Sequence, residues 1–134
     1  MIYTSYFAKL NKLPPHIIPI SICGKAPDWY TGLQYKKLAP KYDFFMKWKE
    51  SHNNEYYIKC FQEQVLDKLN VRKVLEELDD MLVMAATEIG YTGDPMQVPR
   101  MALVCYEKPI DFCHRHLVAD WFNKNGIVCE EYKF

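Results

Sequence analysis

The sequence has no excess of charge of either sign, because 17 lysines and arginines are balanced by 17 aspartates and glutamates. A net charge of zero disfavours a globally basic nucleic-acid-binding protein, although it leaves a local basic patch open. The chain also has no apolar run long enough to span a bilayer. Near its start, Tyr3, Thr4 and Ser5 interrupt the apolar residues, unlike the core of a secretory signal. We therefore expect a cytoplasmic protein with no membrane partner.

Close cysteine pairs are absent as well. The cysteines are odd in number, widely scattered and without a C-x-x-C motif; they are Cys23, Cys60, Cys105, Cys113 and Cys129. This pattern indicates neither a disulfide framework nor a zinc ribbon, and it is typical of a reduced compartment. Glycine-rich phosphate loops and dinucleotide fingerprints are missing too, so the sequence predicts no cofactor.

What the sequence does have is apolar material. Hydrophobic residues make up 49% and aromatic residues 15% of the 134 positions, which suffices for one packed core and predicts a single domain over residues 1–134. Strand-like and helix-like segments follow one another along the chain, which predicts an α/β domain with a mainly parallel sheet of about four strands and helices packed on it. The strand-like segments are 1–8, 16–23, 101–106 and 127–132. Pro19, inside the second of them, predicts an edge position or a bulge.

The stretch from Met101 to Ala119 is the most informative part of the chain. Residues 101–106 are an apolar run of strand length, typical of a central strand that is buried on both faces. Pro109 and Asp111 then end this strand. A helix is predicted from Phe112 onwards, with Asp111 as its N-cap. The free amides and the positive dipole end of such a helix start favour an anion or substrate site.

Cys113, His114 and Arg115 would lie in the first turn of this helix, and each has two interpretations. Cys113 is either a nucleophile that the helix dipole activates or a small buried apolar residue. His114 is either an acid/base group or a buried histidine bonded to the backbone. Arg115 either binds a phosphate or carboxylate or forms an ion pair with Glu107 or Glu131.

Other candidates follow from the rule that ligands bind beyond the carboxyl ends of parallel strands. Ser5 and Tyr6 end the first strand, and Cys105 and Glu107 lie at the end of the central one. Glu107 is a candidate acid/base residue or a partner that orients His114, and His116 is expected at the surface. Cys105, Cys113 and His114 are metal-capable, but their spacing lacks the close pairs of structural zinc sites, so no metal is predicted.

Residues 24–40 form the least regular segment, and they carry Trp29, Tyr30 and Tyr35. Long loops with aromatic anchors often bind ligands or close over a site, where such rings could stack on a substrate. The alternative is a loop that packs its aromatic side chains on the domain.

Four motifs resemble domain-of-unknown-function family 488, which occurs in bacteria, archaea and phages. They are Tyr3-Thr-Ser-Tyr6, Pro19-Ile-Ser-Ile22, Trp29-Tyr-x-Gly-x-x-Tyr-x-x-Leu-Ala-Pro40 and Cys105-Tyr-Glu-Lys-Pro-x-x-Phe-Cys-His-Arg-His116. The resemblance covers nearly the whole chain, and its Cys-x7-Cys-His-Arg signature is the most specific part. It implies a small α/β domain with Glu107, Cys113, His114 and Arg115 in a shared site, but it implies no reaction. The chain departs from many relatives at residues 20–23, where they carry Asp-Val-Arg.

Two functions from different classes remain, besides a purely structural role for the Cys-His-Arg turn. The first is an enzyme that acts on a small anionic substrate, such as a nucleotide or a base within nucleic acid. The second is a non-catalytic binding module, for example an accessory protein of phage or mobile-element origin that binds a nucleotide or a partner. The sequence leaves the oligomeric state open.

Overall fold

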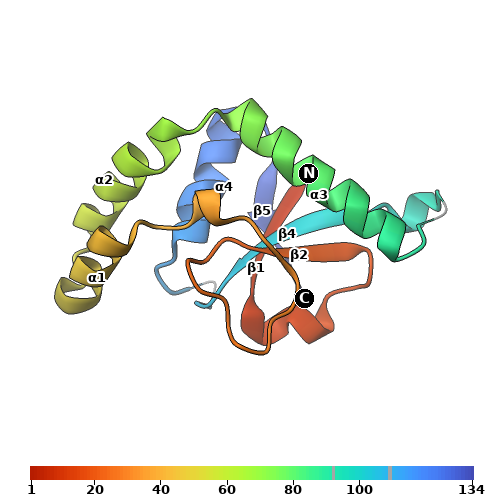
Figure 1. Cartoon of the computed structure of the whole chain (residues 1–134), viewed down its shortest axis with the longest axis horizontal. Coiled ribbons are helices and arrows are strands. Elements are labelled where there is room, and N and C mark those ends of the chain that lie inside the picture. The colour runs from red at the N-terminus through yellow and green to blue at the C-terminus, as the bar shows by residue number, and fades with distance from the viewer. Residues whose placement is uncertain (92, 109) are drawn as a thin grey trace.

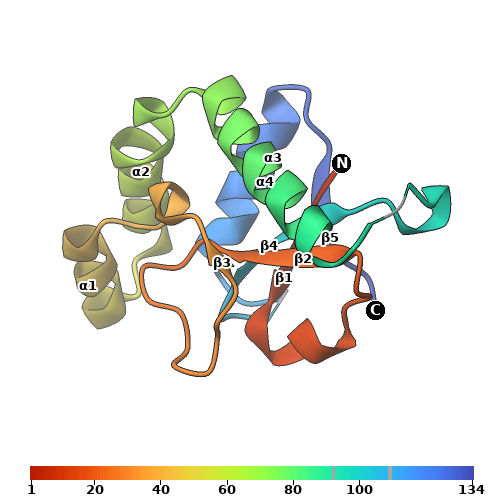
Figure 2. The same cartoon turned by 45° about the vertical axis from the view of Figure 1, so that its right-hand side comes forward.

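The structure of the protein, a computed structural model, describes residues 1–91, 93–108 and 110–134. Pro109, one of the two residues predicted to end the central strand, lies outside the described residues. The arrangement of the described residues is shown in two views (Figures 1 and 2).

One parallel sheet forms the centre of the described residues. Its five strands lie in the order β3-β2-β4-β1-β5, and every adjacent pair runs parallel. The strands are β1 (Ile2–Tyr6), β2 (Ile17–Ser21), β3 (Leu33–Gln34), β4 (Arg100–Cys105) and β5 (Cys129–Glu131). The prediction of an α/β domain with a mainly parallel sheet is confirmed, with five strands in place of about four. The additional strand is β3, which consists of two residues within the irregular 24–40 segment.

Strand β4 is the central strand, as its apolar run predicted. It pairs with β1 on one side and β2 on the other, and residues 101–105 are all buried. The prediction that Pro19 places β2 at the edge is wrong, because β3 lies outside β2. However, β3 pairs only with Ile20 and Ser21, and Pro19 precedes this contact. A proline without an N–H is tolerated there.

Four α-helices and four short 3-10 segments account for the other regular structure in the described part of the chain. The helices are α1 (Tyr42–Ser51), α2 (Asn54–Gln64), α3 (Val71–Glu88) and α4 (His114–Lys124); the 3-10 segments are η1 (Phe7–Lys12), η2 (Lys36–Leu38), η3 (Leu66–Lys68) and η4 (Pro95–Gln97). Asn53 and Asn70 cap α2 and α3 through their side-chain oxygens. Gly126, just after α4, has a φ of 80°, the left-handed conformation in which glycine often follows a helix end. Among the described helices, none is both long and apolar enough to cross a bilayer.

The two faces of the sheet are covered differently (Figure 2). On one face, Ile20, Met101 and Leu103 pack in one buried cluster with residues of α2, α3 and α4. On the other face, a smaller cluster joins strand residues such as Ala102 and Val104 to η1 and to the loop before β3. The irregular loop therefore serves as a cover for the face that carries no α-helix.

Candidate functional site

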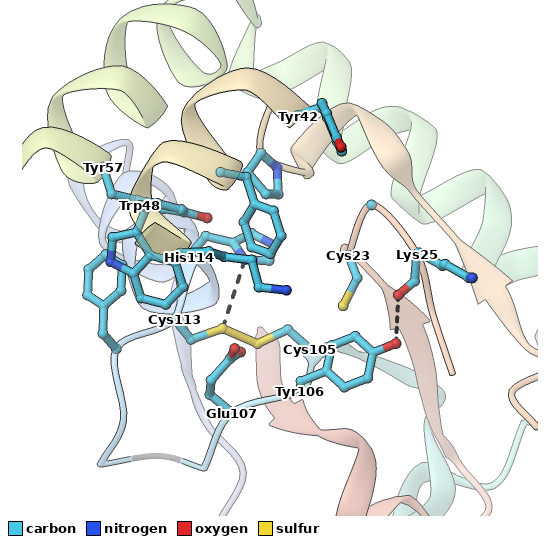
Figure 3. A pocket seen from close by; sticks show the side chains of 15 residues that line it. Cys23, Lys25, Tyr42, Trp48, Tyr57, Cys105, Tyr106, Glu107, Cys113 and His114 are labelled. Carbon is cyan, nitrogen blue, oxygen red and sulfur yellow. Dashed lines mark hydrogen bonds between the residues drawn. A yellow bond between two sulfur atoms is a disulfide. The ribbon is translucent and has the colours of Figure 1, made fainter. Parts of the chain in front are cut away.

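A cavity of about 680 Å³ opens at the carboxyl ends of β2 and β4 (Figure 3). This is the edge of the sheet where the sequence predicted a site, and the volume is typical of small-molecule sites. Its lining comes from the ends of the two strands, from α1 and α2, and from the start of α4. The lining residues are Cys23, Gly24, Lys25, Pro40, Tyr42, Phe45, Trp48, Lys49, Tyr57, Cys105, Tyr106, Glu107, Phe112, Cys113 and His114.

One wall of the cavity is built from aromatic rings. The ring of Trp48 lies 5.6 Å from the rings of both Tyr57 and Phe112, between centroids. The indole nitrogen of Trp48 donates a hydrogen bond of 2.8 Å to Asn54, which fixes the orientation of the ring. On the same helix, the amine of Lys49 lies 5.4 Å above the ring of Phe45. The wall therefore combines flat apolar surface with a cation.

Cys105 and Cys113, called the sulfur pair below, lie on the floor of the cavity and are joined by a disulfide (Figure 3). Cys105 ends β4, and Cys113 is the N-cap of α4. The predicted N-cap, Asp111, is wrong, and the helix begins two residues later than expected, at His114. Phe112 packs its ring against Trp48 and Tyr57, and Cys113 is extended, with a φ of −153°. The cysteine pattern did not predict this bond.

His114 is buried and points one ring nitrogen at the sulfur pair. Its Nε2 lies 2.7 Å from the backbone carbonyl oxygen of Ile22, and because a carbonyl can only accept, Nε2 carries the proton. The lone pair of Nδ1 then faces the Sγ of Cys113 at 3.9 Å. Burial lowers the pKa of His114 to about 4, the hydrogen bond to Ile22 raises it in part, and Arg115 lowers it again. The ring is therefore neutral at pH 7. His116, expected at the surface, is half-buried.

Arg115 forms the ion pair that the sequence left as an alternative, and its partner is Glu131. The guanidinium is fully buried and donates two hydrogen bonds of 3.0 Å to the Glu131 carboxylate. Its Nη1 also donates to the Sγ of Cys105 at 3.0 Å and to the backbone oxygen of Glu107 at 2.6 Å. Arg115 does not line the cavity, so this guanidinium fastens the strand ends together and is not placed to bind an anion there.

Glu107, Cys23 and Tyr106 complete the floor. In Figure 3 the carboxyl group of Glu107 points toward the sulfur pair. Burial raises the pKa of Cys23 to about 12, so its side chain is a thiol at pH 7. The hydroxyl of Tyr106 donates a hydrogen bond of 2.7 Å to the backbone oxygen of Lys25, which joins the end of β4 to the segment after β2. Glu107 is thus the carboxylate that the described lining residues offer for acid/base work.

The two β1 candidates lie next to the site but do not line it. Ser5 is buried inside the strand, and its hydroxyl has no hydrogen-bond partner among the described residues. Tyr6 lies with its ring 5.6 Å from the guanidinium carbon of Arg115. Strand β4 lies between β1 and β2, so the end of β1 packs beside β4 on the side away from β2.

The aromatic loop packs on the domain, which is the second of its two interpretations. The hydroxyl of Tyr30 donates to the backbone oxygens of Leu33 and Pro19, at 2.6 and 3.2 Å. The hydroxyl of Tyr35 donates a 2.6 Å hydrogen bond to Glu77, on α3. Trp29 is 62% exposed and contacts Phe7 edge-on. None of these three aromatic residues lines the cavity.

Comparison of the chain with models of protein families, with curated proteins and with solved structures found no match. The resemblance to family 488 therefore stays a prediction.

Sequence reasoning missed the residues that α1 contributes, chiefly Tyr42, Trp48 and Lys49. Aromatic residues at helical spacing usually indicate a face that packs in the core. Lys49 is the signal that could have distinguished these residues from core residues, because it places a cation next to an otherwise aromatic face. Which end of the sheet this helix would cover does not follow from its own sequence.

Proposed function

We propose that the cavity binds a small aromatic anion, of the nucleotide or nucleobase class, and that the protein acts on it as an enzyme. The observation that carries this proposal is one cavity that combines aromatic walls, two lysines and reactive side chains on its floor. The resemblance to family 488 is consistent with a site at Glu107, Cys113 and His114, although it adds no reaction.

Stacking would supply much of the affinity for a ring. A base stacked on aromatic side chains gains about 1–3 kcal/mol, and Trp48 and Phe112, which line the cavity and are half-buried, present such surface. Negative charge on the ligand would be met by the amines of Lys25 and Lys49, which take the role first assigned to Arg115. Both lysines line the cavity, whereas the Arg115 guanidinium is bound to Glu131.

The floor offers two kinds of reactive group. Glu107 is a carboxylate that can exchange a proton with a bound ring. Once the disulfide is reduced, Cys113 is a thiol whose nearest acceptor is the unprotonated Nδ1 of His114, at 3.9 Å. Arg115 donates a hydrogen bond of 3.0 Å to the Sγ of Cys105 and so holds that sulfur in place on the floor.

The alternative is a binding module that uses the same cavity without chemistry. The disulfide favours it, because a sulfur pair in a disulfide leaves neither cysteine as a free nucleophile. Cys23, the remaining thiol in the lining, is protonated at neutral pH because burial raises its pKa.

The test is a calorimetric titration of the wild-type protein with the four ribonucleoside monophosphates. We expect one of them to bind at one molecule per chain, and Lys49→Ala to weaken its binding about tenfold, since a hydrogen bond to a charged group is lost. Lys47→Ala is the matched control, because Lys47 is exposed on the same helix and does not line the cavity.

The proposal fails if none of the nucleotides binds, or if the Lys49 and Lys47 variants bind alike. Chromatography of the bound nucleotide after incubation with oxidised and with reduced protein then separates the two functions. A new product indicates the enzyme, and a nucleotide recovered unchanged from both samples indicates the binding module.

A further inference from the structure

Three potential metal ligands meet on the floor of the cavity. One ligand atom each from Cys105, Cys113 and His114 lie within 4.8 Å of one another, and all three residues are buried. We propose that, once the disulfide is reduced, these residues hold a zinc ion, with a fourth coordination position open to the cavity. This inference goes beyond the proposed function, because it does not depend on which molecule the cavity binds.

The spacing of the Cys113 sulfur and the His114 nitrogen suits a tetrahedral ion, and the two sulfurs are free to separate once the disulfide is reduced. Zinc holds thiolate sulfur at about 2.3 Å and imidazole nitrogen at about 2.0–2.1 Å, which places neighbouring ligand atoms about 3.5–3.8 Å apart. The Sγ of Cys113 and the Nδ1 of His114 are already 3.9 Å apart. The Cα atoms of Cys105 and Cys113 are 7.5 Å apart, which exceeds the usual disulfide range of about 4.4–6.8 Å. An ion between the two sulfurs would fill this wider span.

His114 already has the tautomer that a zinc ligand needs. Its Nε2 donates to the Ile22 carbonyl, so the free lone pair is on Nδ1, the nitrogen that faces Cys113. Histidines that bind metals usually donate their other N–H to a carbonyl or carboxylate in this way. The contact with Ile22 therefore both orients the ring and selects the nitrogen that binds.

The charges also match. Two thiolates neutralise one Zn²⁺, so no net charge is left buried on the floor. Arg115 donates to the Sγ of Cys105, and its own charge is neutralised by Glu131. The site thus has a hydrogen-bond donor on one sulfur without an additional unpaired charge.

The fourth position distinguishes this site from a purely structural one. All three proposed ligands line the cavity, and Glu107 lines it beside them (Figure 3). Zinc with three protein ligands and an open position binds water and lowers the pKa of that water to about 7. Glu107 is placed to exchange a proton with such a water.

The test begins with removal of the disulfide. A phosphine reduces the bond with the help of one water molecule. The S–S bond breaks, each sulfur receives one proton from the water, and the phosphine takes up the water oxygen and becomes a phosphine oxide. The reduced protein, freed of metal, is then titrated with Zn²⁺, and separately with Co²⁺. We expect one ion per chain, two protons released per ion as the thiols ionise, and the absorption bands of tetrahedral cobalt with thiolate ligands.

The variants Cys105→Ser, Cys113→Ser and His114→Gln should each weaken zinc binding by more than about 100-fold, because a direct ligand is lost. Glutamine at 114 keeps a donor for Ile22 but lacks the Nδ1 lone pair. Cys60→Ala is the control, since Cys60 is a free buried cysteine outside the cavity, and it should bind zinc as the wild type does.

Oxidised wild-type protein gives a test that needs no substitution, because its sulfurs are joined and should bind no zinc. The inference is overturned if the reduced chain takes up less than one equivalent, if oxidation leaves binding unchanged, or if the Cys113 variant binds as tightly as the wild type. Nucleotides are absent from this titration, so its result and that of the nucleotide titration are independent.

Discussion

At the scale of single residues, the ion pair of Arg115 and Glu131 decides how the site is held. It joins α4 to β5, and through Cys105 and the backbone of Glu107 it also holds the end of β4. Glu131 in turn accepts a hydrogen bond of 2.6 Å from the hydroxyl of Thr4, on β1. One guanidinium thus connects the three neighbouring strands β4, β1 and β5 next to the cavity.

We therefore predict that Glu131→Gln destabilises the protein by about 3 kcal/mol, because the buried guanidinium loses its counter-charge. The measurement is the free energy of unfolding from urea titrations. Glu130→Gln is the matched control: Glu130 is exposed on the same strand, and its substitution should change stability by less than about 0.5 kcal/mol. Equal unfolding midpoints for the two variants would show that the pair contributes little.

At the same scale, the sequence predicted part of the site and could not predict the rest. Cys105, Glu107, Cys113 and His114 do line the cavity, because the carboxyl end of a parallel strand and the start of the next helix must meet. The sequence did not decide whether Arg115 pairs with Glu107 or with Glu131. Glu131 is sixteen residues from Arg115 along the chain, and its position depends on where β5 lies in the sheet.

At the scale of elements, the stability of a helix depends in part on the residue that caps its N-terminus. The side-chain oxygen of Asn70 accepts a 3.1 Å hydrogen bond from the backbone N–H of Lys73 and so caps α3. This helix packs Val74 and Leu78 into the main core. A frayed α3 would therefore weaken the cover of the sheet.

Asn70→Ala should lower the free energy of unfolding by about 1 kcal/mol, because one backbone donor at the helix start loses its acceptor. Asn70→Asp should retain most of the stability, since the aspartate side chain can accept the same bond. Thermal and urea unfolding of both variants check this. If the two variants are equally destabilised, the loss has another cause than the cap.

The limits of prediction for the elements are physical as well. Strand β4 was predicted from its uninterrupted apolar run, and the structure confirms it. Strand β3 has two residues and no pattern of its own. The start of α4 was misplaced because Asp111 is a good N-cap by type, whereas Cys113 holds that position once Phe112 packs against the wall of the cavity.

At the scale of the whole molecule, burial of ionisable groups links the fold to pH. Cys129 is 4% exposed, and burial, assisted by Glu131 and Glu130, raises its pKa from 9.0 to about 12. The thiol stays protonated in the folded chain at pH values where the unfolded chain ionises. Its contribution to stability is therefore complete below pH 9.0 and is lost as the pH rises toward 12.

We predict that, between pH 9.0 and about 12, the free energy of unfolding of the wild type falls more steeply with pH than that of Cys129→Ala. The difference in slope should approach about 1.4 kcal/mol per pH unit. Urea titrations of both proteins at about pH 8 and about pH 10.5 measure it. Parallel decreases would mean that Cys129 ionises alike in the folded and unfolded chains.

The strand order has a consequence for synthesis on the ribosome. Strand β1 pairs with β4 and β5, so Tyr3 contacts Ala102 and Glu130, and neither partner exists while the first hundred residues are being translated. Strand β2 also waits for β4. Both strands consequently emerge with unpaired edges and apolar side chains, the condition in which nascent chains pair with one another or recruit chaperones. The time that a ribosome spends on the helices and loops between β2 and β4 therefore sets how long these edges stay unpaired.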